Sequence, residues 1–324
     1  GGDIALFKGI AKVLIESGNI DMAFIEDHTS GYQGYAQDIM ETSWTDITTS
    51  SAIDRAKFNH LADLYLSAEN VIFSWAMGIT HHDHGVDNVE SIVNLALLRG
   101  MVGKENAGLL PLRGHSNVQG VGSMGVTPAL KDTVLKKLEK KMGILVPQAN
   151  GLDTMGCIES AYNGEMDFAF LMGGNLYAAT PDAQYSEQAL SNVPFKVFLT
   201  TTLNQSHFFG VGEETIILPV AARDEEKQPT TQESMFNFVR MSDGGIVRLN
   251  NVRSEIDIIA DIAAGTLGNN KIDFLTFKKH ANIRDAIGQI IPGFENIKDI
   301  DRTKEEFQIA NRTFHKPEFA TVDG

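Results

Sequence analysis

The hydrophobic positions alternate between a helical period and short continuous apolar runs. Asp3 is suited to cap a helix, and Ile4, Phe7 and Ile10 follow it at helical spacing until Gly18 ends the segment. The same spacing predicts further helices near residues 54–65, 89–98, 153–163, 181–190, 254–265 and 280–291. A short apolar run predicts a buried strand at 71–75, and further apolar runs predict strands at 168–172, 195–199 and 215–218. This alternation of helices and strands is typical of a layered α/β fold.

Several segments interrupt this pattern. Residues 42–51 are rich in threonine and serine and predict a turn. Glycine or asparagine occupies nine of the 27 positions in 100–126, which predicts a long functional loop. Thr127 and Pro128 then resemble the N-cap and first residue of a helix that runs through Met142. Beyond about residue 268 the pattern weakens, apart from the helix at 280–291, and predicts a loop-rich C-terminal extension.

The length of 324 residues corresponds to about two domains. We place the first at residues 1–126 and the second, with its loop-rich extension, at residues 127–324, with the break inside the 113–128 loop. Both are expected to be α/β domains.

Composition narrows the classes of function. The 27 basic and 42 acidic residues give a net charge of −15, which disfavours binding to nucleic acid or to an anionic membrane. The single cysteine, Cys157, excludes a disulfide framework or a thiolate metal cage within the chain. Neither an 18-residue apolar run nor a signal-peptide pattern is present, so we expect a cytoplasmic protein.

Two motifs invite interpretations that their contexts disfavour. His81, His82, Asp83 and His84 could suggest zinc, but adjacent histidines in one loop rarely converge on a metal, so we expect a polar loop facing a ligand and no metal ligand. Gly120, Gly122 and Gly125 match a dinucleotide-binding pattern and precede a helix. No apolar strand leads into them, and no acidic residue follows at the distance a ribose contact requires. A nicotinamide site is therefore disfavoured.

The densest polar set of the chain is Arg113-Gly-His-Ser-Asn-Val-Gln-Gly120. Its guanidinium can bind a carboxylate through two parallel hydrogen bonds, and its imidazole can titrate near neutral pH. The set suits a ligand that makes many hydrogen bonds and includes a small anion. The alternative is a polar loop that only connects two domains.

Two further segments follow predicted strands. Gly173, Gly174 and Asn175 come at the end of the strand at 168–172, and Thr200–Thr202 at the end of the next strand. Nucleotides bind at the carboxyl ends of parallel strands, where glycine turns and hydroxyls can share one crevice. Each signal alone is weak, because glycine turns at strand ends are common.

Taken in order, these motifs resemble the formate-dehydrogenase-like family of molybdopterin oxidoreductases. The resemblance is clearest in Pro111–Gly120. It also includes Asp3-Ile-Ala-Leu6, Ala23-Phe24-Ile25, Ser30-Gly31-Tyr32, Trp75-Ala-Met-Gly-Ile-Thr80, Gly85-Val86, Asn94–Gly100, Met172–Asn175, Ile217-Leu-Pro219 and Glu255–Ala260. It covers nearly the whole chain, but only the middle of a full family member.

The resemblance implies two Rossmann-like three-layer α/β domains of the formate dehydrogenase/DMSO reductase type, present here as a fragment. Both would be cofactor-binding domains, the first of them partial. It implies bis(molybdopterin guanine dinucleotide) with molybdenum or tungsten. The residues that would line the pterins are Trp75, Met77, Gly78, Thr80, His81, Gly114, Asn117, Gln119 and Gly120. Those that would hold a guanine nucleotide or its phosphates are Gly173, Gly174, Asn175, Thr200 and Thr202.

The same resemblance implies an oxidoreductase acting on a small molecule such as formate, with electrons passing to a partner protein. Arg113 would orient the substrate carboxylate, and His115, which stands where formate enzymes commonly have glutamine, would relay a proton. A 4Fe–4S cluster and the metal-ligating side chain belong to a region of the family ahead of this stretch, so the fragment alone is expected to be inactive. The alternative is a molybdenum-free structural or electron-transfer protein that resembles the large subunit of respiratory complex I.

Overall fold

The computed structural model describes residues 1–268, 271–310 and 316. The described chain divides into two compact units, Gly1–Ser116 and Asn117–Ala310. Our boundary between residues 126 and 127 refers to cofactor-binding domains and stays a prediction.

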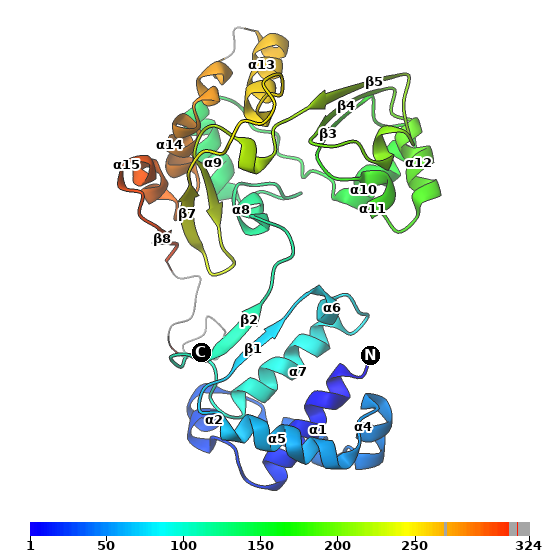
Figure 1. Ribbon diagram of the computed structural model, residues 1–324, viewed down its shortest axis with the longest axis vertical. Helices are drawn as coiled ribbons and strands as arrows, with labels where there is room; N and C mark the ends of the chain where they lie inside the picture. The colour runs from blue at the N-terminus through cyan, green and yellow to red at the C-terminus, as the bar shows by residue number, and fades with distance from the viewer. Residues whose placement is uncertain (269–270, 311–315, 317–324) are drawn as a thin grey trace. The chain divides into compact units, whose positions relative to one another are not determined.

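The first unit is mainly helical and contains a small parallel sheet (Figure 1). Its elements are α1 (Asp3–Glu16), α2 (Met22–His28), α3 (Tyr32–Glu41), α4 (Trp44–Ser51), α5 (Arg55–Ser67), β1 (Ile72–Trp75), α6 (Met77–Thr80), α7 (Gly85–Leu97) and β2 (Gly108–Pro111). Strands β1 and β2 pair in parallel, with Ile72 opposite Gly108 and Trp75 opposite Pro111. Helix α7 lies in the crossover between them, so the carboxyl ends of both strands meet at one edge.

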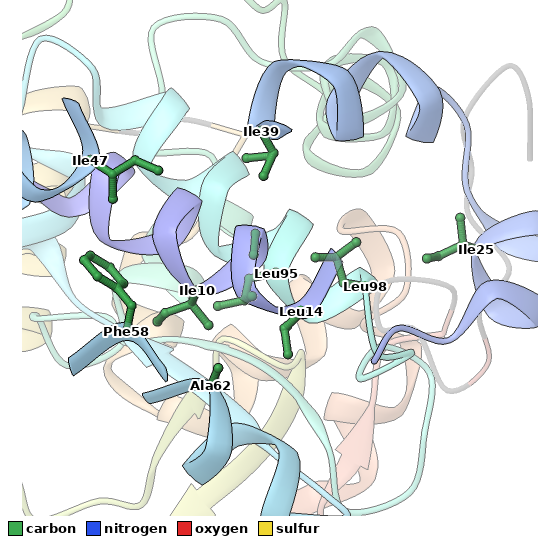
Figure 2. Close-up of a cluster of buried hydrophobic side chains, with 10 residues drawn as sticks. Ile10, Leu14, Ile25, Ile39, Ile47, Phe58, Ala62, Leu95 and Leu98 are labelled. Atoms are coloured by element: carbon green, nitrogen blue, oxygen red, sulfur yellow. The ribbon is translucent and has the colours of Figure 1, made fainter. Parts of the chain in front are cut away.

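The core of this unit forms around α1. Figure 2 shows side chains of α1 pointing toward residues of α5 and α7, including Leu14, Phe58 and Leu95. These three side chains are at most 2% exposed. Burying an apolar side chain of this size contributes about 1.5–3 kcal/mol to folding. This packing fixes α1, α5 and α7 relative to one another.

The second unit begins with helices and a three-stranded parallel sheet. Its first elements are α8 (Val118–Ser123), α9 (Asp132–Met142), α10 (Thr154–Tyr162), β3 (Phe168–Met172), α11 (Leu176–Ala179), α12 (Ala183–Ser191), β4 (Phe195–Thr200), the 3-10 turn η1 (Gln205–His207) and β5 (Glu214–Pro219). The strand order is β3-β4-β5. Phe168 pairs with Phe195, and Thr200 pairs with Pro219. The apolar runs at 168–172, 195–199 and 215–218 are therefore confirmed as strands.

The rest of the second unit combines helices with an antiparallel sheet of order β6-β7-β8. Its elements are η2 (Arg223–Glu225), β6 (Thr230–Glu233), β7 (Phe238–Ser242), α13 (Glu255–Leu267), η3 (Phe274–Lys278), α14 (His280–Ile290), η4 (Glu295–Asp299), α15 (Ile300–Thr303) and β8 (Phe307–Gln308). Helices α13 and α14 confirm the predictions at 254–265 and 280–291. The extension expected to be rich in loops is largely helical over its described residues.

Four local predictions are wrong. Residues 42–51 form α4 and not a turn, because Ser43 Oγ accepts a hydrogen bond from the Asp46 N–H and Ile47 is buried. The expected loop at 100–126 contains β2 and α8. The predicted strand at 71–75 is not fully buried, since Ile72 is 57% exposed.

The fourth correction concerns the helix start at Thr127 and Pro128. Helix α9 begins at Asp132, and the Lys131 carbonyl accepts its first hydrogen bonds, from the N–H groups of Val134 and Leu135. The Pro128 carbonyl instead accepts from the Gly151 N–H at 2.8 Å. That pairing ties the segment to another loop, so the proline is not the first residue of the helix.

Candidate functional site

The carboxyl edge of the β1–β2 sheet brings together two segments predicted from sequence. The Leu112 N–H donates to the Trp75 carbonyl at 2.7 Å, which extends the parallel pairing past the strand ends. A Cβ on Gly114 would lie 3.3 Å from Met77 Sδ, so Gly114 passes directly beside Met77. The loop after β1 and the loop after β2 thus share one surface.

The remaining predicted residues at this edge are accessible. Gly78 and Thr80 belong to the single turn of α6, and His81 follows it; all are exposed. Arg113 and His115 are exposed after β2. This edge therefore presents a guanidinium, an imidazole and hydroxyl groups to a ligand.

Two residues that sequence reasoning missed support α6 from behind. Asn88 is buried, and its Nδ2 donates to the Ile79 carbonyl at 2.9 Å. A Cβ on Gly85 would lie 2.3 Å from the Thr80 carbonyl oxygen, so only glycine allows α7 to begin this close to α6. The available sequence signal was the helical spacing of Asn88 from Ile92 and Leu95, which puts this polar residue on the apolar face of its helix, where it needs a partner.

The second part of the polar set, from Asn117 to Gly120, belongs to the second unit. Asn117 adopts a left-handed φ of 58° at the start of α8, and its Oδ1 accepts from the Glu233 N–H at 2.9 Å. A Cβ on Gly120 would lie 2.2 Å from that same oxygen. Asn117 and Gly120 therefore form a packed joint with β6, and Gln119 is half-buried beside them.

The glycines at 120, 122 and 125 do not form a phosphate loop between a strand and a helix. Gly120 and Gly122 lie inside α8, which has already begun at Val118. Within the described residues, His81, His82, Asp83 and His84 are not part of any group of three side chains that could hold a metal ion. The His84 ring instead lies 3.1 Å from an Asp87 carboxylate oxygen.

The carboxyl edge of the β3–β4–β5 sheet brings Gly173–Asn175 and Thr200–Thr202 together. The Gly173 N–H donates to the Leu199 carbonyl at 2.8 Å. Gly173 and Gly174 have φ of +67° and +73°, and a Cβ on either would meet nothing within 4 Å. The backbone of this turn is consequently open to an approaching ligand.

Residues of the loop after β4 bond directly to this turn. Asn204 Nδ2 donates to the Gly174 carbonyl at 2.7 Å, and Ser206 Oγ donates to Asn175 Oδ1 at 2.7 Å. Thr200 Oγ1 donates to the Thr202 carbonyl at 2.7 Å, which shapes the loop that leads to them. Sequence reasoning missed Asn204 and Ser206; their signal was that polar residues continue for several positions beyond the strand end.

The charged groups at the β3–β4–β5 edge differ from one loop to the next. The loop after β5 carries Asp224, whose pKa is lowered by hydrogen bonds from Arg248, together with Glu225 and Glu226. Burial raises the pKa of Glu255, and the nearby Glu226 adds to this effect. The loops after β3 and β4 carry no acidic side chain at residues 172–180 and 199–212, so in a chain with a net charge of −15 they are comparatively favourable for an anion.

Comparison with known proteins identifies the class. A family model described as "Molybdopterin oxidoreductase" matches residues 1–264. The chain therefore belongs to the molybdopterin oxidoreductase family, as the resemblance in its sequence predicted.

Its relatives include oxidoreductases. The chain is 32% identical to "Uncharacterized oxidoreductase Rv2900c" of Mycobacterium tuberculosis, with 100% of the chain and 43% of that protein covered. It is 32% identical to "Protein YdeP" of Escherichia coli, over 96% of the chain and 43% of that protein. It is 26% identical to SAB2186c of Staphylococcus aureus, whose name provisionally assigns it as a formate dehydrogenase, over 92% of the chain and 30% of that protein. The chain thus spans less than half the length of these relatives.

Among solved structures, acetylene hydratase from Pelobacter acetylenicus matches with a TM-score of 0.63 and 12% sequence identity. The match covers 95% of this chain and 45% of that one. At this identity the match establishes the fold, and it confirms the predicted α/β class. Within the described residues, no helix is both long and apolar enough to cross a membrane.

Proposed function

We propose that the natural protein containing this chain binds bis(molybdopterin guanine dinucleotide) with molybdenum or tungsten and carries out a two-electron oxidation or reduction of a small substrate such as formate. The observation that carries the proposal is the pair of open strand-end surfaces, one in each unit, in a chain of the molybdopterin oxidoreductase family. Parallel α/β sheets bind ligands at such carboxyl edges.

The residues at both surfaces fit a large anionic cofactor. Gly173 and Gly174 leave their backbone open, as phosphate oxygens require for close approach. The absence of a side chain at Gly114 lets the chain pass directly beside Met77. Hydroxyl and imidazole groups are present at Thr80, His81 and Thr202. Polar groups that do not repel an anion suit a pterin and its phosphates.

When bound, the cofactor would supply a metal that accepts or donates two electrons. The chain's own residues would bind and orient the substrate. Arg113 would hold a carboxylate by two parallel N–H···O hydrogen bonds, which fix direction as well as distance. His115 would accept or release a proton at a ring nitrogen, the role that imidazole most often takes in acid–base catalysis. A 4Fe–4S cluster and an electron-transfer partner belong to the same proposal.

Metal and pterin content of the natural protein tests the cofactor assignment. After anaerobic purification, we expect molybdenum or tungsten by elemental analysis and an oxidised pterin derivative by fluorescence. A folded, correctly matured protein that lacks both would favour a structural or electron-transfer homologue instead.

The role of Arg113 has a separate test. In the natural protein, Arg113→Lys keeps the charge but removes the fork, and we expect kcat/KM for a carboxylate substrate to fall by about 10- to 100-fold, the loss of one or two charge-assisted hydrogen bonds. Arg302→Ala is the control, since Arg302 is exposed and, within the described part of the chain, pairs with Asp299 at 3.5 Å. Unchanged kcat/KM in Arg113→Lys and Arg113→Ala would exclude the orienting role.

A further inference from the structure

The turn after β3 is held by a hydrogen-bond network from the loop after β4. Asn204 Nδ2 donates to the Gly174 carbonyl, while Asn204 Oδ1 accepts from the Ser206 N–H at 3.0 Å. Ser206 Oγ accepts from the Tyr177 N–H at 3.0 Å and donates to Asn175 Oδ1. We call these contacts the Asn204–Ser206 network. It joins segments about 30 residues apart in sequence.

The network is sheltered from water at its centre. Ser206 is 2% exposed, so both hydrogen bonds of its hydroxyl form with little competition from solvent. Asn175 Oδ1 also accepts from the Ala178 N–H at 3.3 Å, which links the network to the first turn of α11. Removing the hydroxyl would therefore take the partner from the half-buried Tyr177 N–H and leave Asn175 Oδ1 with one donor fewer.

An aromatic contact also connects the turn after β3 to the loop after β4. The rings of Tyr177 and Phe209 stack with their centroids 4.8 Å apart and an angle of 13° between planes. Tyr177 lies just after the turn, and Phe209 lies just after η1. The two loops are thus connected by polar and apolar contacts together.

Gly173 and Gly174 need such support. Glycine adopts positive and negative φ about equally readily, so a free chain would place both residues at positive φ only about a quarter of the time. No side chain of their own restricts them, and a Cβ on either would meet nothing within 4 Å. The hydrogen bond from the Gly173 N–H to the Leu199 carbonyl, and the contacts of Gly174 and Asn175 with the second loop, hold this shape.

We propose that the Asn204–Ser206 network is a positioning device that holds the Gly173–Gly174 turn in the shape that receives the diphosphate of a guanine nucleotide. The proposal rests on the cofactor assignment above and adds to it residues that do not touch the ligand. The diphosphate is the chosen part because the turn offers open backbone and no acidic side chain.

Hydrogen exchange of the 324-residue chain tests whether the network holds the Gly173–Gly174 turn in its shape. In Ser206→Ala we expect amides of residues 173–178 to exchange about 10-fold faster, the effect of losing roughly one net hydrogen bond. Ser191→Ala is the matched control: its hydroxyl donates to the Glu187 carbonyl at 2.7 Å on exposed α12, and it should leave this peptide unchanged. Equal exchange in wild type and Ser206→Ala would overturn the network's role.

Asn204→Asp provides a second, nearly isosteric variant. It removes the donor to the Gly174 carbonyl and keeps the acceptor for the Ser206 N–H. We again expect the amides of residues 173–178 to exchange faster than in wild type, while the far-ultraviolet circular dichroism signal of the fold is retained. If Ser206→Ala does not fold, this variant alone decides whether the network holds the shape of the turn.

Titration calorimetry with GDP and with guanosine tests whether the turn receives the diphosphate of a guanine nucleotide. For Ser206→Ala we expect the Kd of GDP to rise about 10-fold relative to wild type, while the Kd of guanosine stays within about twofold. A purely structural defect would weaken both ligands equally, and that result would overturn the assignment to the diphosphate. No measurable GDP binding by the wild-type chain would overturn it as well.

These outcomes separate the inference from the proposed function. Metal and pterin absent from the natural protein, with faster exchange in Ser206→Ala, would contradict the cofactor but uphold the network. A natural protein that keeps full cofactor content with Ser206→Ala, together with unchanged exchange, would uphold the cofactor and overturn the network.

Discussion

Lys196 has no exposed surface, yet no carboxylate is among its hydrogen-bond partners. Its ammonium donates to the carbonyls of Leu190 and Val193 at 2.6 and 2.7 Å, where α12 ends. A cation there satisfies carbonyls that the helix leaves unpaired and interacts favourably with the helix dipole. Burial nevertheless lowers the pKa of Lys196 to about 8.

This lowered pKa predicts a specific pH dependence of stability. The unfolded chain holds the proton up to about pH 10.5 and the folded chain only up to about 8, so between these values the unfolded state binds more protons. The free energy of unfolding should therefore rise with pH across this window, relative to Lys196→Met. Urea denaturation of both proteins at pH 7.5, 9 and 10 measures the difference.

Lys104→Met is the control for this comparison, because Lys104 is an exposed lysine that also donates to a carbonyl, that of Glu69. Its stability difference from wild type should not show the rise across the window. A difference between wild type and Lys196→Met that does not vary with pH would contradict the buried ammonium.

At the residue scale, sequence could locate only part of the candidate site. Arg113, His115 and the glycines of the strand-end turn could be predicted as site residues from their type and position. Few other structural roles require a guanidinium or a pair of glycines in such a loop. Asn204 and Ser206 could not be predicted, because asparagine and serine are common in loops and their partners lie about 30 residues away. Asn117 was predicted to contact the cofactor, and the structure adds its hydrogen bond to β6.

At the scale of elements, the contact between α1 and α5 depends on a missing side chain. Gly9 lies within α1, and a Cβ there would be 2.3 Å from the Phe58 ring. Glycine costs about 1 kcal/mol of helix propensity relative to alanine, but here it lets a buried aromatic ring pack against the helix backbone. The close approach is what joins these two helices.

Gly9→Ala should therefore destabilise the protein by about 1–3 kcal/mol, because overpacking exceeds the gain in helix propensity. Gly34→Ala is the matched control. Gly34 lies within α3, and its added Cβ would meet nothing within 4 Å, so stability should rise by up to about 1 kcal/mol. Thermal denaturation followed by circular dichroism measures both. Equal effects of the two substitutions would show that α5 moves away without cost.

Errors at the element scale share one physical cause. Trp44–Ser51 is helical although its threonines and serines have modest helix propensity, because Ser43 caps it and Ile47 is buried. Strands β6 and β7 pair antiparallel, but their polar residues gave no alternating signal in the sequence. Tertiary contacts decided these segments against their local preference.

At the scale of the whole molecule, each unit has its own apolar core. Leu14 belongs to the core of the first unit, and Phe294 to a core in the second. Both are at most 2% exposed. Independent cores imply that a local defect in one unit leaves the other intact.

Leu14→Ala and Phe294→Ala should each cost roughly 2–5 kcal/mol, but in different parts of the chain. Leu14→Ala should speed hydrogen exchange in α1, α5 and α7 and not in α14, and Phe294→Ala should do the reverse. Exchange measured by mass spectrometry separates the peptides. Acceleration in both units by either substitution would indicate a single cooperative structure.

The sequence by itself determined the α/β class, the family, the strands of the β3–β4–β5 sheet and the polar residues that follow them. It could do so because apolar periodicity and rare motifs are local properties of the chain. Only the tertiary structure decided that Ile47 of α4 is buried in the core of the first unit, that Asn117 accepts a hydrogen bond from Glu233, and that Asn204 and Ser206 bond to Gly174 and Asn175. Those outcomes depend on contacts between distant residues, and such contacts exist only once the chain has folded.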